Sequence, residues 1–197
     1  LAVSSAKIGE AHIFSAFVRD ITDRRRAEHR LASQYAVTRV LSEATTLEEA
    51  VPKIIQAIGE SLEWDLGLFW RVDKGAGVLR CFDQWNAPSI QADPFTSDAW
   101  QRVFRRGEDL PGRIWANGKS VWVVDVTMDS ECIRGPQARQ VGFHGAFGLP
   151  ILVGGEIEGI IEFFSRQVRQ LDDELFRMVE DIGLKIEAIQ TDTRGAV

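Results

Sequence analysis

The most reactive side chains in the middle of the chain are two thiols and one imidazole, at Cys81, Cys132 and His144. A thiol attacks as the thiolate, and a thiol reductase needs a nucleophilic and a resolving thiol within reach of each other. Cys81 lies in a run that predicts a strand, and Cys132 lies in a polar stretch that predicts a loop. The pattern therefore favours a core thiol at Cys81 and a histidine that hydrogen-bonds a loop at His144.

The segment 112–120 ends in Gly118-Lys119-Ser120 and invites comparison with a phosphate-binding loop. A Walker loop has four residues between its glycines and connects a strand to a helix. Here five residues separate Gly112 from Gly118, and the segment precedes a predicted strand. We therefore expect a helix end followed by a turn.

Patterns for metal binding and for catalysis are missing from the sequence. The three histidines lie far apart, no Cys-x-x-Cys or Gly-x-Ser-x-Gly occurs, and no pair of carboxylates is distinguished by its spacing. Arg134 and Arg139 flank Gly135-Pro136, where a helix start could meet an anion, but a solvated loop is the favoured interpretation. We expect no catalytic residue, no metal and no cofactor.

The composition is that of a globular protein of 197 residues, with 45% hydrophobic and 26% charged residues. A net charge of −6 argues against nucleic acid as a partner, and no apolar run is long enough for a membrane span. Two cysteines without an export signal indicate a cytoplasmic location. The chain begins with Leu1 rather than Met, so we expect a fragment of a longer protein. All six tryptophans lie between Trp64 and Trp122.

The elements that must position these side chains begin with a hairpin in residues 1–18 and a helix over 22–44. One face of that helix carries apolar or small side chains at spacings of three and four: Ala27, Leu31, Tyr35, Thr38 and Leu41. A second helix follows Thr46, which has capping-box spacing to Glu49. Pro52 predicts a start nearer Glu49 or a kink.

From Asp65 onward the pattern predicts an antiparallel sheet with helical loops. The expected strands are 66–72, 78–85, 121–124, 145–153 and 157–164. The expected short helices are 97–106 and 110–118. In the first of these helices we expect Trp100, Val103 and Phe104 to face inward. A final helix begins after Asp172 or Asp173. It carries a heptad seam that we expect at a dimer interface, formed by Leu175, Val179, Ile182, Ile186 and Ile189.

Three stretches resemble known families. Residues 14–28, Phe-Ser-Ala-Phe-Val-Arg-Asp-Ile-Thr-Asp-Arg-Arg-Arg-Ala-Glu, resemble the last strand and exit helix of a PAS domain. Residues 110–122, and 142–151 with 155–159, resemble the central signature and the last hairpin of a GAF domain. The resemblance implies an α+β fold with about five to six antiparallel strands, helices on one face and long helical loops on the other. It divides the chain into a PAS end (1–21), a signalling helix (22–44), a GAF body (45–170) and a C-terminal helix and tail (171–197).

The resemblance to GAF domains also brings specific ligands into consideration. Some GAF domains bind haem through a single His near the strand expected at 145–153, but the spacing from His144 to that strand differs. Bilin attachment needs a His directly after the Cys, whereas Ile133 follows Cys132. The cyclic-nucleotide signature is absent, because Gly118 separates Asn117 from Lys119. A related group reduces free methionine sulfoxide with loop cysteines, which would require Cys132 to act with a second thiol.

These observations lead to a non-catalytic sensory or relay module between a PAS domain and an effector such as a histidine kinase or a cyclic-di-nucleotide enzyme. We expect a homodimer through the flanking helices, without nucleic acid or direct membrane contact. The alternatives are a small-molecule or haem receptor and a methionine sulfoxide reductase. A receptor pocket would lie between the sheet and residues 86–140, with walls from Trp85, Trp115, Trp122, His144 and Phe147.

Overall fold

The computed structural model describes residues 2–8, 11–17, 19–44, 46–91, 93–178 and 180–181. Its centre is a six-stranded antiparallel sheet with the strand order β5-β4-β3-β8-β7-β6. The strands are β3 (Leu66–Asp73), β4 (Val78–Asn86), β5 (Val103–Phe104), β6 (Val121–Val123), β7 (Gly145–Val153) and β8 (Glu156–Ser165). The predicted α+β fold is confirmed, with β5 as the strand that the periodicity did not indicate.

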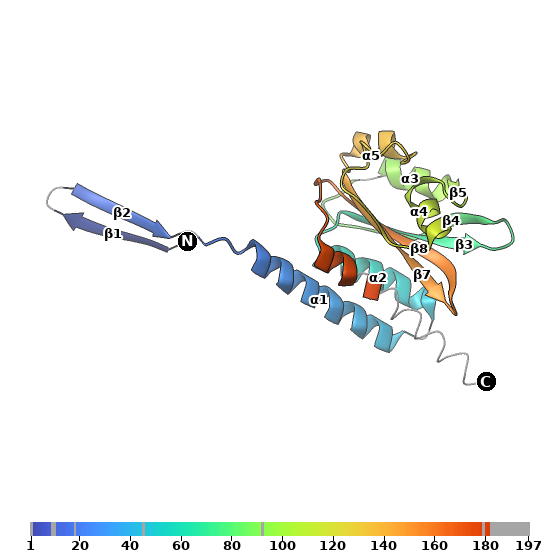
Figure 1. The fold of residues 1–197 in the computed structure, drawn as a ribbon, viewed down its shortest axis with the longest axis horizontal. Helices are drawn as coiled ribbons and strands as arrows, with labels where there is room; N and C mark the ends of the chain where they lie inside the picture. Colours follow the sequence, from blue (N-terminus) through green and yellow to red (C-terminus); the bar gives the residue numbers. More distant parts are fainter. Residues whose placement is uncertain are drawn as a thin grey trace.

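Helices cover both faces of this sheet (Figure 1). On one face α2 (Leu47–Ser61) packs on β3 and β4, and α1 (Thr22–Glu43) packs on α2. The helical residues 173–178 lie on the same face. On the other face lie α3 (Asp93–Gln101), α4 (Asp109–Asn117) and α5 (Gly135–Val141).

The N-terminal strands β1 (Ala2–Ile8) and β2 (Ala11–Phe17) pair as an antiparallel hairpin, as the sequence predicts. The hairpin precedes α1 and lies beyond the N-terminal end of this helix, away from the six-stranded sheet (Figure 1). Within the described part of the chain, no helix combines the length and apolar character that crossing a bilayer requires.

The sheet separates two apolar cores because neighbouring residues of each strand point to opposite faces. In β8, Ile161 and Phe163 belong to the helix-side core, under α1 and α2, whereas Ile160 and Phe164 belong to the loop-side core, under α3–α5. Burial on both faces explains why β7 is apolar throughout and why β8 is largely apolar from Gly159 to Phe164. One residue interrupts the run in β8: Glu162, which is fully buried on the loop side.

The predicted start of α2 is confirmed by its cap. The Thr46 hydroxyl accepts a hydrogen bond from the Glu49 amide at 3.3 Å, and the helix begins at Leu47. Pro52 lies inside the helix, which continues to Ser61, so the expected later start at Glu49 is wrong. Pro52 has no N–H to donate, and the stability lost with that hydrogen bond is outweighed by burial of the apolar face of α2.

Of the apolar stripe predicted for α1, only Leu41 is buried in the helix-side core, whereas Ala27, Leu31, Tyr35 and Thr38 are exposed. Leu31 and Tyr35 are 68% and 74% exposed, whereas Val37 and Val40 are buried against α2. The helix carries two weak stripes, and the contact with the strongly apolar face of α2 decides which of them is buried. The stripe of Leu31 and Tyr35 is left uncovered in the monomer.

Two loop-side expectations are wrong. The helix expected at 97–106 is α3, which begins at Asp93 and ends at Gln101, because the chain then pairs with β4 as β5. Trp100 and Val103, expected inward, are 50% and 40% exposed, and only Phe104 is buried. The polar stretch expected as an irregular loop contains α5, which ends at Gly142 in a left-handed conformation with φ 81°.

Candidate functional site

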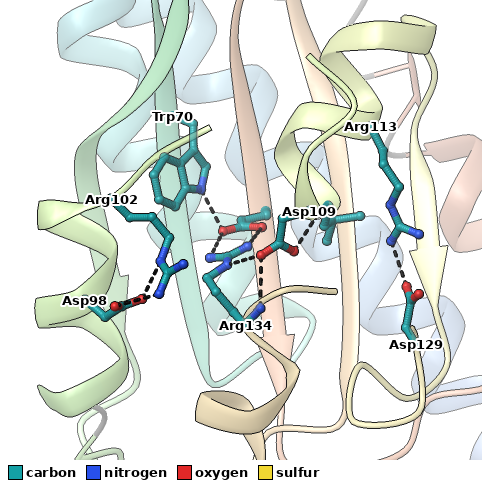
Figure 2. A network of polar contacts seen from close by, with 9 residues as sticks. Trp70, Asp98, Arg102, Asp109, Arg113, Asp129 and Arg134 are labelled. Atoms are coloured by element: carbon teal, nitrogen blue, oxygen red, sulfur yellow. Dashed lines mark hydrogen bonds and ion pairs between the residues drawn. The ribbon is translucent and has the colours of Figure 1, made fainter. Parts of the chain in front are cut away.

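Arg134 marks the most unusual environment among the described residues. It precedes α5 in the loop between β6 and β7, and its side chain has no exposed surface. The solvated loop expected for this residue is therefore wrong. Figure 2 shows the side chain extending from the loop toward Trp70 and Asp109.

Two carboxylates bind the guanidinium. Its Nη1 and Nη2 donate to the two carboxylate oxygens of Glu162 at 2.7 and 2.8 Å, which is a bidentate pair. Its Nε donates to Oδ2 of Asp109 at 2.8 Å. The Arg134 amide donates to the same Asp109 oxygen at 3.2 Å, so Asp109 holds both the backbone and the side chain of this residue.

Aromatic rings complete the enclosure. The guanidinium carbon lies between 5.0 and 5.4 Å from the ring centroids of four aromatic residues, distances at which a cation is attracted to a ring. These residues are Trp70, Phe95, Phe104 and Phe164. The Trp70 indole also donates to Oε1 of Glu162 at 2.6 Å. We call Arg134, Asp109, Glu162 and these four rings the Arg134 chamber.

The electrostatics of the chamber keep Arg134 charged. Burial lowers the pKa of Arg134, but Glu162 and Asp109 together raise it above its ordinary value. Burial is the largest single influence on the pKa of Asp109 and raises it, but the Arg134 guanidinium together with hydrogen bonds from Leu110 and Cys132 holds that pKa below its usual range. For Glu162 burial is the larger effect, and its pKa is raised despite Arg134. Two carboxylates thus share one buried cation.

Local backbone geometry fixes the two ends of the chamber. Asp109 adopts φ 55°, an uncommon conformation for a residue with a side chain, and its Oδ1 accepts from the Leu110 amide at 2.6 Å. On the loop, a Cβ on Gly135 would lie 2.9 Å from the Val126 carbonyl oxygen. The glycine after Arg134 therefore lets the loop fold tightly enough to direct Arg134 inward.

Both thiols lie close to this chamber and are buried. Burial, with the Asp109 carboxylate, raises the pKa of the Cys132 thiol to about 12. Burial, with Glu162, raises the pKa of Cys81 to about 12 as well. Cys81 lies in β4, as predicted, but Cys132 does not occupy an accessible loop. Neither thiol has the lowered pKa of a catalytic cysteine.

The five residues proposed as pocket walls do not meet in one place. Phe147 lies in the helix-side core, and Trp85 and Trp122 pack against that core. Trp115 lies in the loop-side core, across the sheet. His144 directly precedes β7, its side chain is 37% exposed, and its Nδ1 lies 3.1 Å from Oδ2 of Asp125. The three strand residues Trp85, Trp122 and Phe147 all point to the helix side, whereas Trp115 lies on α4, which covers the other face.

The heptad seam is described only at its first position. Leu175 is buried in the helix-side core, together with Met178, so it packs within its own domain. The remaining positions, Val179, Ile182, Ile186 and Ile189, lie outside the described residues. Asp172 begins this helix, since its Oδ1 accepts from the Leu175 amide at 2.9 Å.

The sequence reasoning missed Trp70, Asp109 and Glu162. A signal was present: Glu162 interrupts the run Ile160-Ile161-Glu162-Phe163-Phe164, and a carboxylate inside a buried strand requires a partner. The partner, Arg134, is separated from it by 28 positions, and no periodicity relates the two.

A second candidate surface lies along α1 and α2. A groove of about 630 Å³ is lined by residues of both helices, including Tyr35, Ala36, Val40, Ala57 and Ser61. Tyr35 of this lining is 74% exposed, and Leu31, four positions before it on α1, is 68% exposed. Among the described residues, no group of three or more His, Cys, Asp or Glu is placed to hold a metal ion.

Known protein structures resemble the fold of this chain. Three similar solved structures are a free methionine-R-sulfoxide reductase from Neisseria meningitidis in complex with its substrate, the GAF domain of a phosphoenolpyruvate-protein phosphotransferase from Coxiella burnetii, and the nlh2 GAF domain from A. aeolicus in an inactive state. Their identities to this chain are 18%, 19% and 16%, and their TM-scores are 0.69, 0.67 and 0.65. The alignments cover 92%, 87% and 84% of this chain and 99%, 99% and 97% of the others, respectively.

These identities support a shared fold alone, and the similar structures include a reductase as well as GAF domains of signalling type. No curated protein sequence matches the chain. The sequence profile of the GAF domain matches residues 44–188, which is most of the chain. On that match, and with the six-stranded sheet described above, the chain belongs to the GAF domain family.

Proposed function

We propose that this chain is a non-catalytic sensory or relay GAF module of a bacterial signalling protein. It passes a change of state through its flanking helices to an effector outside the chain. The observation that carries the proposal is the uncovered apolar stripe of α1, where Leu31 and Tyr35 are 68% and 74% exposed. Such side chains on a long helix favour a partner that covers them.

The occupant that we propose for the α1–α2 groove is the same groove of a second copy. A symmetric dimer would place the α1 helices of two chains side by side, since an isologous interface uses the same surface twice. The groove lining carries both signs of charge, Arg39 and Glu43 on α1 and Lys53 and Glu60 on α2, so a copy related by a two-fold axis can pair unlike charges.

Residues on either side of α1 support a place in a longer signalling chain. The segment 14–28 resembles the end of a PAS domain, and the structure forms a hairpin there before α1 begins at Thr22. We propose that this hairpin belongs to a PAS domain, and that the helix after Asp172 leads to an effector such as a histidine kinase or a cyclic-di-nucleotide enzyme.

The reductase alternative is less well supported. The similarity to free methionine-R-sulfoxide reductase is one of fold. Cys81 and Cys132 are both buried, and burial raises the pKa of each to about 12, so neither would be a thiolate near neutral pH. The haem alternative depends on His144 as the ligand, and the Nδ1 of His144 lies 3.1 Å from Oδ2 of Asp125 just before β7.

Sedimentation velocity tests the dimer. We expect the chain to dimerise at micromolar concentration, and Leu31→Glu with Tyr35→Glu to raise the dissociation constant at least tenfold, because the change buries like charges opposite each other. Met128→Glu is the matched control: Met128 is 79% exposed, but on the loop side. A monomeric parent chain, or equal dissociation constants for the two variants, would remove the basis of the relay proposal.

A further inference from the structure

The Arg134 chamber contains the features of a guanidinium recognition site. A bidentate carboxylate, a second carboxylate on Nε and rings around the cation are the features that distinguish Arg recognition from Lys recognition. Three of the five guanidinium N–H groups donate to carboxylate oxygens, at 2.7–2.8 Å. The walls belong to the sheet and to α3 and α4, whereas the cation belongs to a different segment.

That segment is the loop 124–144, between β6 and β7. Few of its side chains are buried apolar groups: Val126, Cys132, Ala138 and Phe143. Its other side-chain anchors include the ion pairs of Arg113 with Asp129 and Glu131, at 2.8 and 2.7 Å. A groove of about 340 Å³ next to Cys132 and Gly135 is lined by residues of this loop. Arg134 therefore provides the main buried charged contact between loop and sheet.

We propose that the chamber is a binding site for a small alkylguanidinium, which the chain fills with its own Arg134 when the loop is closed. A free alkylguanidinium competes for the chamber as the loop opens and withdraws Arg134. This site is independent of the α1–α2 dimer, because the chamber lies on the opposite face of the sheet.

The chemistry of the chamber determines which ligands compete. A neutral ligand leaves both carboxylates uncompensated, and burying an unpaired charge is costly. An alkylammonium carries the charge but cannot reproduce the bidentate pair with Glu162. Because a side chain on a short tether acts at an effective concentration in the range of about 1 mM and above, a free ligand competes at millimolar concentration.

Cys132 reports the loop opening. It lies two positions before Arg134, is buried, and interacts with Asp109 in the closed loop. Because Cys132 is two positions from Arg134 and interacts with Asp109, we expect withdrawal of Arg134 from Asp109 and Glu162 to expose the Cys132 thiol to solvent. Its reaction with a thiol reagent therefore measures the open loop without any substitution in the chain.

The experiment treats the unmodified full chain with a pulse of N-ethylmaleimide at 0, 1, 5 and about 20 mM ethylguanidinium, a range set by the effective concentration above. Mass spectrometry of the peptides reads Cys132 and Cys81 separately, and far-UV circular dichroism verifies the native fold. We expect labelling of Cys132 to rise at least fivefold and to saturate. Ethylammonium and urea at equal concentration and ionic strength are the ligand controls.

Two variants verify that the effect belongs to the chamber. Glu162→Gln removes one charge of the bidentate acceptor and should abolish the saturable response. Arg134→Ala removes the atoms that ethylguanidinium would replace, so ethylguanidinium should raise its melting temperature and ethylammonium should not.

The proposal is overturned if Cys132 in the unmodified chain labels equally fast in ethylguanidinium and in ethylammonium, since Arg134 would then be a permanent part of the core. Labelling of Cys132 in the unmodified chain tests the proposal even if the Arg134→Ala variant does not fold. A response that persists in Glu162→Gln would equally overturn it. The labelling is done at a concentration where the chain is monomeric by sedimentation, so either result leaves the dimer test unaffected.

Discussion

At the scale of single residues, the charge balance around Arg134 governs what substitution there does. Arg134→Ala leaves Glu162 and Asp109 buried without their cation, and breaking a buried pair on one side costs about 3–5 kcal/mol. We expect that loss in the free energy of unfolding, measured by urea denaturation at pH 7.

The matched control is Arg80→Ala. Arg80 also pairs with an aspartate, Asp73 at 3.1 Å, but its side chain is 57% exposed. An exposed pair contributes about 0–1 kcal/mol. Equal losses in the two variants would show that solvent reaches the Arg134 chamber and screens its charges.

The buried thiols make a prediction about pH. Burial raises the pKa of Cys81 and Cys132 to about 12, against an ordinary value of 9.0. Between these values the native chain keeps protons that the unfolded chain has lost, so the free energy of unfolding falls as the pH rises from 9 toward 12. Below pH 9 both states are protonated and this contribution to stability is fully present.

Urea denaturation of the parent chain and of Cys132→Ala at pH 8, 9 and 10 measures this contribution. The stability difference between the two chains should change with pH, because the variant loses one of the two titrations. Parallel curves would indicate that the Cys132 thiol ionises as readily in the folded chain as in the unfolded one.

At the scale of elements, the contact of α2 with the sheet depends on a glycine in β3. A Cβ on Gly67 would lie 2.3 Å from Cγ2 of Ile55 and 2.9 Å from the Phe163 ring, and both partners are fully buried. We expect Gly67→Ala to cost about 1–3 kcal/mol in the free energy of unfolding, as overpacked cores do.

Gly75→Ala serves as the comparison, since Gly75 lies in the exposed β3–β4 turn with its nearest atom 3.5 Å from an added Cβ. That substitution should be neutral or stabilise by up to about 1 kcal/mol, because it restricts the unfolded chain. A neutral Gly67→Ala would mean that α2 can move away from the sheet at little cost.

Most elements follow from local patterns because their causes are local. The Thr46 cap, the left-handed Gly118 that ends α4 with φ 67°, and the Gly154-Gly155 turn each act within a few residues. The exceptions are α3 and α1. Pairing of β5 with β4 ends α3 early, and the partner helix α2 selects the buried stripe of α1. In both cases the cause is a contact with another element, which local periodicity does not show.

At the scale of the whole molecule, Arg30 connects α1 to the start of the C-terminal helix. Its Nη1 lies 3.2 Å from Oδ2 of Asp172 and its Nη2 lies 2.5 Å from Oε2 of Glu174. Asp172 also caps that helix through the Leu175 amide. In the proposed relay, these contacts link the incoming helix to the outgoing one.

Arg30→Ala should therefore loosen the first turn after Asp172. We expect amide hydrogen exchange in residues 173–178 to become about two- to fivefold faster, the change that a partly exposed ion pair can supply. Arg24→Ala, which removes the exposed pair with Glu28 on α1, should leave those amides unchanged. Equal exchange in the two variants would locate the link between the helices elsewhere, in the packing of Leu175 and Met178.

The sequence by itself determined the antiparallel sheet, the order of most helices and strands, and the GAF resemblance that the family profile confirms. These depend on periodicity, caps and turns, which act over a few residues. Only the tertiary structure decided which side chains meet. It divided the expected pocket residues between the two faces of the sheet, because the strand residues Trp85, Trp122 and Phe147 point to the helix side while α4 carries Trp115 on the loop side. It also brought Arg134 to Glu162 and Asp109, since a buried charge requires a partner that the chain supplies from a distant loop.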